Sequence, residues 1–385
     1  MKTMKLGVLL LAFLLAAVAM VPMVSAEETM QKSIINAASD PAKDPEIVAI
    51  MTNATSMETL PGYLQEKTSV NSNNVNGMVS PSTDVGKETE AYLDNYIPPS
   101  TQIINLMKTK GYSNSQITDY LSKNGYGWDP KTGANWKGVA PTAAEQKIID
   151  QIRGPNYSPF PETVGNKSTS ELTVSTSSGL TSDRKGTAAL WLPDTNTYFG
   201  ITFSMSPGPM LESSTGTKQH VVTTHVGKPT SSGQQDWTEV GVVRFLNDAS
   251  PRYFSYDNDE KQWQFHGSDN NGALTNYEIY VTNTQESLGY ICYTYINNQW
   301  VRSGHLKNRQ TQFNMANEVW AEGNNAFTSD GGVNSIFRDP KLFGPNGDQW
   351  WGNYPATVSQ PPSQDQPPYA SYRMNGNAYE LSSWV

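Results

Sequence analysis

The feature that most constrains the fold is a series of short strand-like segments that fills the chain from about residue 166 onward. The segments are rich in β-branched and aromatic residues, and clusters of Gly, Pro, Asn, Asp and Ser separate them. Examples are "TYFGITFSM", "QHVVTTHVG", "TEVGVVRF" and "YEIYVTN". Many short strands joined by turns, without helices between them, are typical of antiparallel sandwiches. We therefore expect residues 166–385 to form a mainly β domain, an antiparallel β-sandwich.

Residues 27–160 show helical rather than strand patterns. The stretch "STQIINLMKTKGYSNSQITDYLSKNGYG" predicts two short helices, and Ser113 or Asn114 is the expected N-cap of the second. Further on, Thr142 and Glu145 have capping-box spacing ahead of a run of isoleucines, which predicts another helix. We expect a small α-helical N-terminal region, which is either a removable prosegment or a permanent accessory domain.

Residues 1–26 have the pattern of a signal peptide. Lys2 and Lys5 precede an apolar run, and the small residues of "VSA" at 24–26 supply a cleavage site. The mature chain is therefore expected to be secreted or extracytoplasmic, and a retained segment would instead hold it at the cell surface. The single cysteine, Cys292, cannot form an internal disulfide, so a packed core must stabilise the fold.

The charge of the chain narrows the classes of partner. The net charge is −9, the isoelectric point is about 5.0, and no run of basic residues is present. This balance argues against nucleic acid and against an anionic membrane surface as partners.

Glu239 stands out in the predicted strand "DWTEVGVVRF". Side chains alternate between the two faces of a strand, so Glu239 shares its face with Gly241, Val243 and Phe245. A carboxylate among apolar neighbours costs free energy unless another group binds or uses it. Glu239 is therefore a candidate functional residue.

A second unusual strand is "TQFNMANEVWAEG". Phe313, Met315, Val319 and Ala321 share one face, which we expect to be the core between the sheets. The opposite face is polar but carries a large aromatic residue, as the floor of a cleft would, and consists of Asn314, Ala316, Glu318, Trp320 and Glu322. The alternative is a solvent-facing strand with ordinary surface glutamates.

The segments "TEVGVV", "PRYFSYDND" and "NEVWAEG" together resemble the neprosin-type glutamic peptidases and, more distantly, the eqolisin glutamic peptidases. The resemblance covers about residues 166–385 and implies a sandwich whose catalytic pair lies on the concave face of a bent sheet. It places the catalytic residues at Glu239 and Glu318. Glu322 is a rival, because Trp320 follows Glu318 by two residues rather than one. The aromatic residues of these segments expected to support the site are Trp237, Tyr256 and Trp320. The cysteine-rich insert of plant neprosins is missing, and their propeptide has no recognisable counterpart.

The resemblance implies a secreted endopeptidase that cleaves peptide or protein substrates with a glutamate pair and water. Two carboxyl groups in one site cannot both ionise cheaply, so the pKa of one is expected to rise. Because the eqolisins have Gln at the position of Glu239, we expect Glu318 to be the general base and Glu239 to stabilise the oxyanion. This chemistry favours acidic pH and requires neither a metal nor a cofactor.

Other catalytic mechanisms fit the sequence less well. The chain has no His-Glu-x-x-His motif and no Gly-x-Ser-x-Gly motif. His220 and His225 fall on opposite faces of a strand, where we expect ordinary, partly exposed side chains, and Cys292 is expected to be a small core residue. The alternatives that stay open are a carbohydrate-binding or glycoside-hydrolysing sandwich and a non-catalytic surface module. The laminarinase pattern Glu-x-Asp-x-x-Glu is absent from "EVWAE".

Overall fold

The computed structural model describes residues 40–61, 83–153, 159, 184–192, 197–208, 210, 217–229, 235–245, 248–269, 272–321, 334–345, 347–350, 357–359, 369–375 and 378–384. The predicted signal peptide and Glu322 lie outside these residues. The chain divides into two compact units. One consists of residues 1–54 and 99–124, and the other of residues 55–98 and 125–385.

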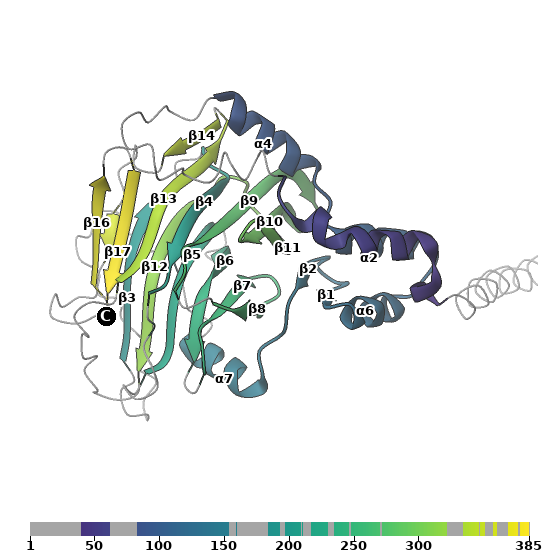
Figure 1. The fold of residues 1–385 in the computed structure, drawn as a ribbon, viewed down its shortest axis with the longest axis horizontal. Coiled ribbons are helices and arrows are strands. Elements are labelled where there is room, and N and C mark those ends of the chain that lie inside the picture. Colours follow the sequence, from purple (N-terminus) through teal and green to yellow (C-terminus); the bar gives the residue numbers. More distant parts are fainter. Residues whose placement is uncertain are drawn as a thin grey trace, which may run out of the picture. The chain divides into compact units, whose positions relative to one another are not determined.

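The larger unit is built on two antiparallel sheets (Figure 1). In the described part of the chain, one sheet has ten strands in the order β1-β2-β11-β10-β9-β4-β13-β17-β16, with β14 paired to β13. The other has seven strands in the order β15-β3-β12-β5-β6-β7-β8. The predicted antiparallel β-sandwich is therefore confirmed.

The strands of the ten-stranded sheet are β1 (Tyr126–Trp128), β2 (Asn135–Lys137), β4 (Gly200–Ser206), β9 (Thr275–Glu286), β10 (Gly289–Ile296), β11 (Gln299–Leu306), β13 (Asn334–Gly344), β14 (Gly347–Trp350), β16 (Tyr369–Asn375) and β17 (Ala378–Trp384). Those of the seven-stranded sheet are β3 (Arg184–Leu192), β5 (Thr217–Pro229), β6 (Gln235–Phe245), β7 (Arg252–Asp257), β8 (Gln262–Ser268), β12 (Gln312–Ala321) and β15 (Thr357–Ser359).

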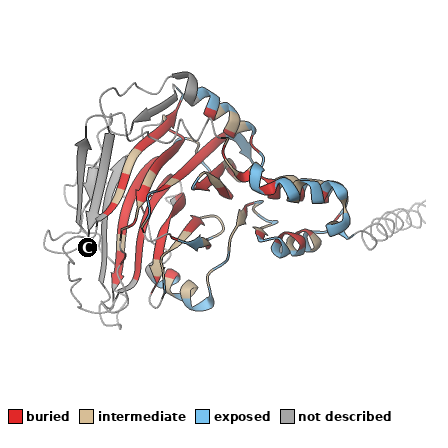
Figure 2. Ribbon diagram, viewed as in Figure 1, coloured by how far each residue is buried: buried red, intermediate tan, exposed pale blue. Residues whose placement is uncertain are grey.

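The core lies between the two sheets, and the long central strands are buried along most of their length (Figure 2). Among the side chains that the seven-stranded sheet contributes, those at most 2% exposed include Val240, Val242, Phe313, Met315 and Val319. The amide of Asn317 lies on this same face, where it contacts His220 at 2.8 Å and Ser335 of the other sheet at 3.5 Å. The predicted core face of β12 is thus confirmed.

Two helices and a hairpin in the larger unit precede the main strands. The helix α4 (Thr83–Asn95) accepts hydrogen bonds at Asp94 from Tyr280 of the ten-stranded sheet and at Glu90 from Arg309, which lies between β11 and β12. The helix α7 (Ala143–Ile152) begins with the predicted capping box of Thr142 and Glu145. Strands β1 and β2 extend the ten-stranded sheet through β11 and were not predicted, because three-residue strands are too short to show alternation.

The smaller unit is helical. It contains η1 (Pro41–Lys43), the first part of α2 (Pro45–Glu58), α5 (Pro99–Thr109) and α6 (Asn114–Lys123). Of the two expected N-caps for α6, Ser113 is the one used, and it forms a capping box with Gln116. Apolar side chains of α5 and α6 are fully buried, among them Ile103, Met107, Ile117 and Leu121. Across the described residues, no helix has the length and apolar character required to span a lipid bilayer.

Buried carboxyl groups gather at one end of β6 and β7, beside β11 of the other sheet. Asp257 approaches Gly304 so closely that a Cβ atom there would lie 2.8 Å from the Asp257 carboxyl carbon. Asp236 accepts a hydrogen bond of 2.7 Å from the backbone N–H of Lys307. Burial raises the pKa of Asp236 to about 6 and raises the pKa of Asp257 well above its usual range, with Glu260 adding to the second shift. Burial between the sheets therefore favours the protonated state of both groups, although the hydrogen bond from Lys307 opposes this shift at Asp236.

We predict that Asp236 makes the sandwich less stable as the pH rises. The pKa of Asp236 is raised by folding from 3.8, so its contribution to stability is complete below about pH 3.8 and is lost as the pH rises through about 6. Asp236→Asn keeps an acceptor for Lys307 without the charge. The variant should match the wild type at pH 4 and exceed it by about 2–3 kcal/mol at pH 8 in urea denaturation. The exposed Asp119→Asn is the control, and an equal difference at both pH values would contradict the assignment.

Candidate active site

Glu239 lies in a row of side chains that crosses the seven-stranded sheet. The strand register pairs Asn314 of β12 with His225 of β5, His225 with Glu239 of β6, Glu239 with Tyr256 of β7, and Tyr256 with Trp263 of β8. Directly paired residues of antiparallel strands project from the same face. We call this face, which points away from the inter-sheet core, the site face.

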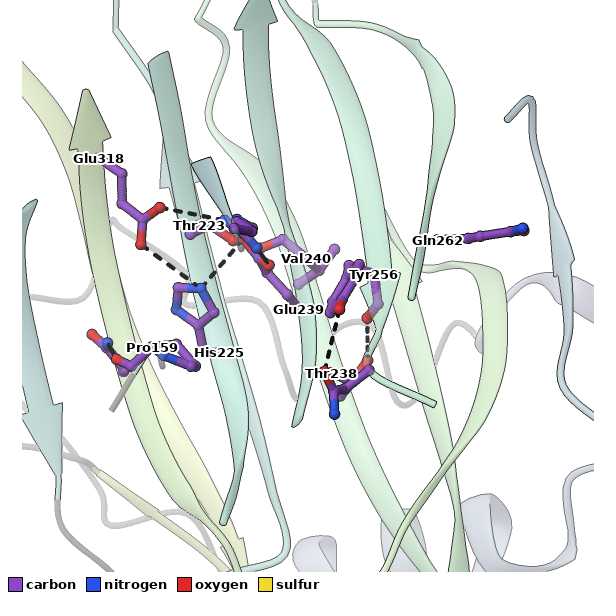
Figure 3. Close-up of polar contacts among 12 residues, drawn as sticks. Pro159, Thr223, His225, Thr238, Glu239, Val240, Tyr256, Gln262 and Glu318 are labelled. Carbon is purple, nitrogen blue, oxygen red and sulfur yellow. Dashed lines mark hydrogen bonds and ion pairs between the residues drawn. The ribbon is translucent and has the colours of Figure 1, made fainter. Parts of the chain in front are cut away.

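Glu318 lies on the site face four residues along β12 from Asn314, so one row of side chains on the same face separates it from this row. The row between the two glutamates consists of Ala316, Thr223 and Gly241, all of which have small side chains or none. Gly241 is required by close packing, since a Cβ atom there would lie 2.7 Å from the Cα atom of Thr223 on β5. The small middle row lets the long side chains of Glu239 and Glu318 converge above it (Figure 3).

The two carboxylates meet at Arg153, the residue that follows α7. Its Nη1 donates to Glu239 Oε2, while its Nη2 donates to Glu239 Oε1 at 2.7 Å and to Glu318 Oε2 at 3.3 Å. The guanidinium carbon also lies 4.7 Å from the ring centroid of Trp263. The Arg153 side chain is 4% exposed, Glu239 is 0% exposed and Glu318 is 12% exposed. One buried cation thus binds both predicted catalytic glutamates.

His225 also contacts both glutamates. Its Nε2 lies 3.3 Å from Glu239 Oε1 and 4.0 Å from Glu318 Oε1 (Figure 3). The prediction that His220 and His225 lie on opposite faces is confirmed, but the prediction that they are partly exposed is wrong. Both are at most 1% exposed, because the site face is as buried here as the core face. The alternation of side chains alone could not show this.

The charge state of Glu239 differs from the one expected for a proton-sharing pair. Burial by itself would raise the pKa of Glu239, but the positive charge of Arg153 and the contact with His225 outweigh burial and lower the pKa to about 2. Glu239 is therefore ionised while Arg153 is bound. The expected competition between two carboxylates for one proton is relieved here by the guanidinium group.

The predicted aromatic residues have different places. Trp237 and Tyr256 lie next to Glu239 on the site face, with ring centroids 5.4 Å apart. Trp320 is buried, but it lies beyond Glu318 on β12, on the side away from Glu239. Burial also raises the pKa of Tyr256, which keeps its hydroxyl protonated. The hydroxyl donates to Asn258 at 3.3 Å.

α7 packs against the aromatic part of the site face. Ile149 is 3% exposed and belongs to one cluster with Val221, Trp237, Val243, Phe245, Phe254, Tyr256, Trp263 and Phe265. Glu145, at the start of α7, forms an ion pair with Arg252 of β7. We refer to α7 together with Arg153 as the α7 arm. Beyond it, the carbonyl oxygen of Pro159 accepts a hydrogen bond from Asn314. Residues on both sides of 154–158 are therefore bound to the site face.

Sequence reasoning did not find Arg153 or His225. Arg153 gave no signal, because its role depends on how α7 docks on the sheet. His225 was noticed but was assigned no function, since its position beside Glu239 depends on the pairing of β5 with β6. Cys292 is buried as predicted, and burial raises the pKa of its thiol well above the usual range. In the described ranges, no group of three or more His, Cys, Asp or Glu side chains is arranged to hold a metal ion.

Comparison with known proteins finds likeness only at the level of solved structures. No family model and no curated protein matches the sequence. Among solved structures, scytalidoglutamic peptidase with a peptide-based transition-state analogue is 10% identical with a TM-score of 0.36, covering 53% of this chain and all of that one. SCP-B, described as a member of the eqolisin family of peptidases, is 10% identical with a TM-score of 0.34 at the same coverage. A Bacillus licheniformis β-glucanase is 13% identical with a TM-score of 0.23, covering 43% and 78%. Values this low do not assign a family or an activity to the chain.

Ile149→Ala should loosen the α7 arm without unfolding the sandwich. Truncating a buried aliphatic side chain costs roughly 2–5 kcal/mol, and here that loss falls on the docking of one helix. Backbone hydrogen exchange over residues 143–153 should therefore become faster, while exchange in β5, β6 and β12 stays unchanged. Lys147→Ala, at an exposed position of the same helix, is the matched control. Equal exchange in the two variants would show that Ile149 does not hold the arm.

Proposed function

We propose that the protein is a secreted endopeptidase that hydrolyses peptide bonds with Glu239, Glu318 and an activated water, and that it works best in acid. The observation that carries the proposal is the convergence of these two glutamates, from strands separated by β5, on the same guanidinium nitrogen and the same imidazole nitrogen. The neprosin-type resemblance of the sequence stays a prediction.

The different exposure of the two glutamates supports the expected division of roles. Glu318 keeps 12% of its side chain exposed and is the better placed to meet water, whereas Glu239 is completely buried. Without Arg153, two carboxylates this close would compete for one proton, and burial favours the neutral form of Glu239. Ionised Glu318 would then take a proton from the attacking water. Neutral Glu239 would donate a hydrogen bond to the oxyanion that develops on the substrate carbonyl. The C–N bond would then break, and the leaving amine would take the proton that Glu318 removed from the water.

The α7 arm blocks this chemistry. An ionised carboxylate is only an acceptor, so Glu239 cannot stabilise an oxyanion while Arg153 binds it. The guanidinium group also occupies the space between the carboxylates, where the water must act. We infer that the chain described here is a latent form and that residues 27–160 are a prosegment.

Acid weakens both ionic contacts of the α7 arm. Folding lowers the pKa values of Glu239 and of Glu145 from 4.5. Burial by itself would raise both values. The charge of Arg153 outweighs burial at Glu239, and hydrogen bonds from Thr142 and Arg252 outweigh it at Glu145. The stability that these ionised groups supply is therefore present above about pH 4.5. For Glu239 it is lost as the pH falls from there toward about 2. Low pH thus favours release of the arm.

Substitution of the two glutamates should separate their roles. After acid activation, Glu318→Gln should lose on the order of a hundredfold or more in kcat, because the general base is gone. Glu239→Gln should keep more activity, because the amide still donates a hydrogen bond. Cleavage of a peptide library is the measurement, a panel of polysaccharides is run in parallel, and Glu88→Gln on the surface of α4 is the control.

Negligible losses in both variants would remove the pair from the mechanism. A large loss of activity only in Glu322→Gln would identify Glu322, rather than Glu318, as the general base. Hydrolysis or binding of a polysaccharide without peptide cleavage would favour the carbohydrate alternative. The activity should also persist in EDTA, and loss that zinc restores would contradict a mechanism based on two carboxyl groups.

Incubation at low pH should shorten the chain and activate it. We expect a new N-terminus between about Gly154 and Ser170, with peptide cleavage rising as the precursor disappears. Arg153→Gln should become active at a higher pH than the wild type, because one ionic contact that acid must break is already absent. Mass spectrometry of the N-terminus alongside a cleavage time course tests both. A full-length chain that is fully active and stays intact in acid would show that the helical region is an accessory domain.

A further inference from the structure

His225 is built into the centre of the site by the sheet itself. Its strand, β5, lies between β6 and β12, and in the register His225 is paired with Glu239 on one side and Asn314 on the other. Both flanking ladders therefore fix the position of the ring. The side chain is completely buried, and its Nε2 points at one oxygen of each glutamate (Figure 3).

The partners of Nε2 define where the hydrogen of the ring is. Glu239 is ionised in this form, and an ionised carboxylate can only accept hydrogen bonds. Nε2 must therefore carry a hydrogen to bind Glu239 Oε1. A ring in this state is either the neutral tautomer or the imidazolium cation, and both carboxylates lie beside the same Nε2–H group.

We propose that His225 is a positioning residue that shares protons with Glu239 and Glu318. The proposal rests on the proposed function of that pair. When Arg153 leaves, the site loses one positive charge, and a proton taken up among the three groups restores it. In the working form the shared proton lies on Glu239, and the neutral ring of His225 donates its Nε2 hydrogen to the other oxygen of that carboxyl group and holds it toward the substrate. The titratable and charged groups around the ring are Glu239 of β6, Glu318 of β12, Tyr256 of β7 and Arg153 of the α7 arm.

A purely structural histidine would behave differently. A side chain that only fills space or satisfies one hydrogen bond would still feel the charge of Glu318, which is 4.0 Å away on another strand, but its replacement would leave the pH dependence of kcat unchanged. A proton-sharing group must respond to the removal of either negative charge and must also change the pH profile when it is replaced. The two tests below measure these two properties.

The first test is an NMR titration of full-length Arg153→Gln with labelled histidines. The chain has four histidines, and burial lowers the pKa of His220 to about 4 and of His266 to about 3, so these two stay neutral above pH 5. The signal that disappears in His225→Gln belongs to His225, and the other titrating signal belongs to His305. Adding Glu239→Gln or Glu318→Gln should each lower the titration midpoint of His225 by roughly one pH unit, because each removes a neighbouring negative charge. Glu88→Gln should leave it unchanged. A midpoint that neither glutamate variant moves would overturn the proposal.

The second test uses peptide cleavage by the acid-activated protein. His225→Phe should lower kcat about tenfold or more with little change in KM, since orientation of the pair is lost rather than substrate binding. His225→Phe should also shift the pH at which kcat declines on the alkaline side of its pH profile. His225→Gln keeps a hydrogen-bond donor toward Glu239, so it should restore part of kcat. It should not restore the alkaline side of the wild-type pH profile, because its amide does not titrate. A folded His225→Phe with the wild-type kcat and pH profile would contradict the proposal. Absence of peptide cleavage in the wild type would instead remove the proposed function, and the NMR titration would still show whether the ring of His225 responds to both carboxyl groups.

Discussion

Two carboxylates on one buried face of a sheet require a positive charge or a proton, and this requirement organises the functional part of the molecule. In the form described here the charge comes from Arg153, which follows a helix that is docked on the same face. The interaction lowers the pKa of Glu239 and keeps it ionised. Charge neutralisation and occlusion of the site are therefore achieved by the same side chain.

The sheet prepares the site through strand order. Glu239 and Glu318 lie on β6 and β12, which are not neighbours, and the strand between them supplies His225. The row of small residues at Ala316, Thr223 and Gly241 gives the longer side chains room to meet. Neighbouring strands alone would have placed two glutamates side by side with no group between them. The inserted strand places an imidazole beside both negative charges.

The fold and Glu239 were accessible to sequence reasoning because both depend on local patterns, whereas Glu318 was selected by the resemblance to glutamic peptidases. Alternation and turn residues predicted the strands, spacing predicted the capping box of α7, and a carboxylate in an apolar strand drew attention to Glu239. Arg153 and His225 were not accessible in the same way, since their roles arise from pairing and docking between distant segments. The burial of His220 and His225 was missed because alternation identifies two faces of a strand but does not show whether both are covered.

Gly241 has a consequence for how motifs of this kind are interpreted. A side chain at this position would press against the backbone of β5, so the glycine two residues after Glu239 is demanded by the pairing of the two strands. The Glu-x-Gly spacing can therefore be retained by packing alone in a homologue that has lost its chemistry. A useful signature for detecting active relatives should instead combine residues whose conservation packing does not explain, namely the second glutamate, the histidine of the intervening strand and an arginine at the end of the preceding helix.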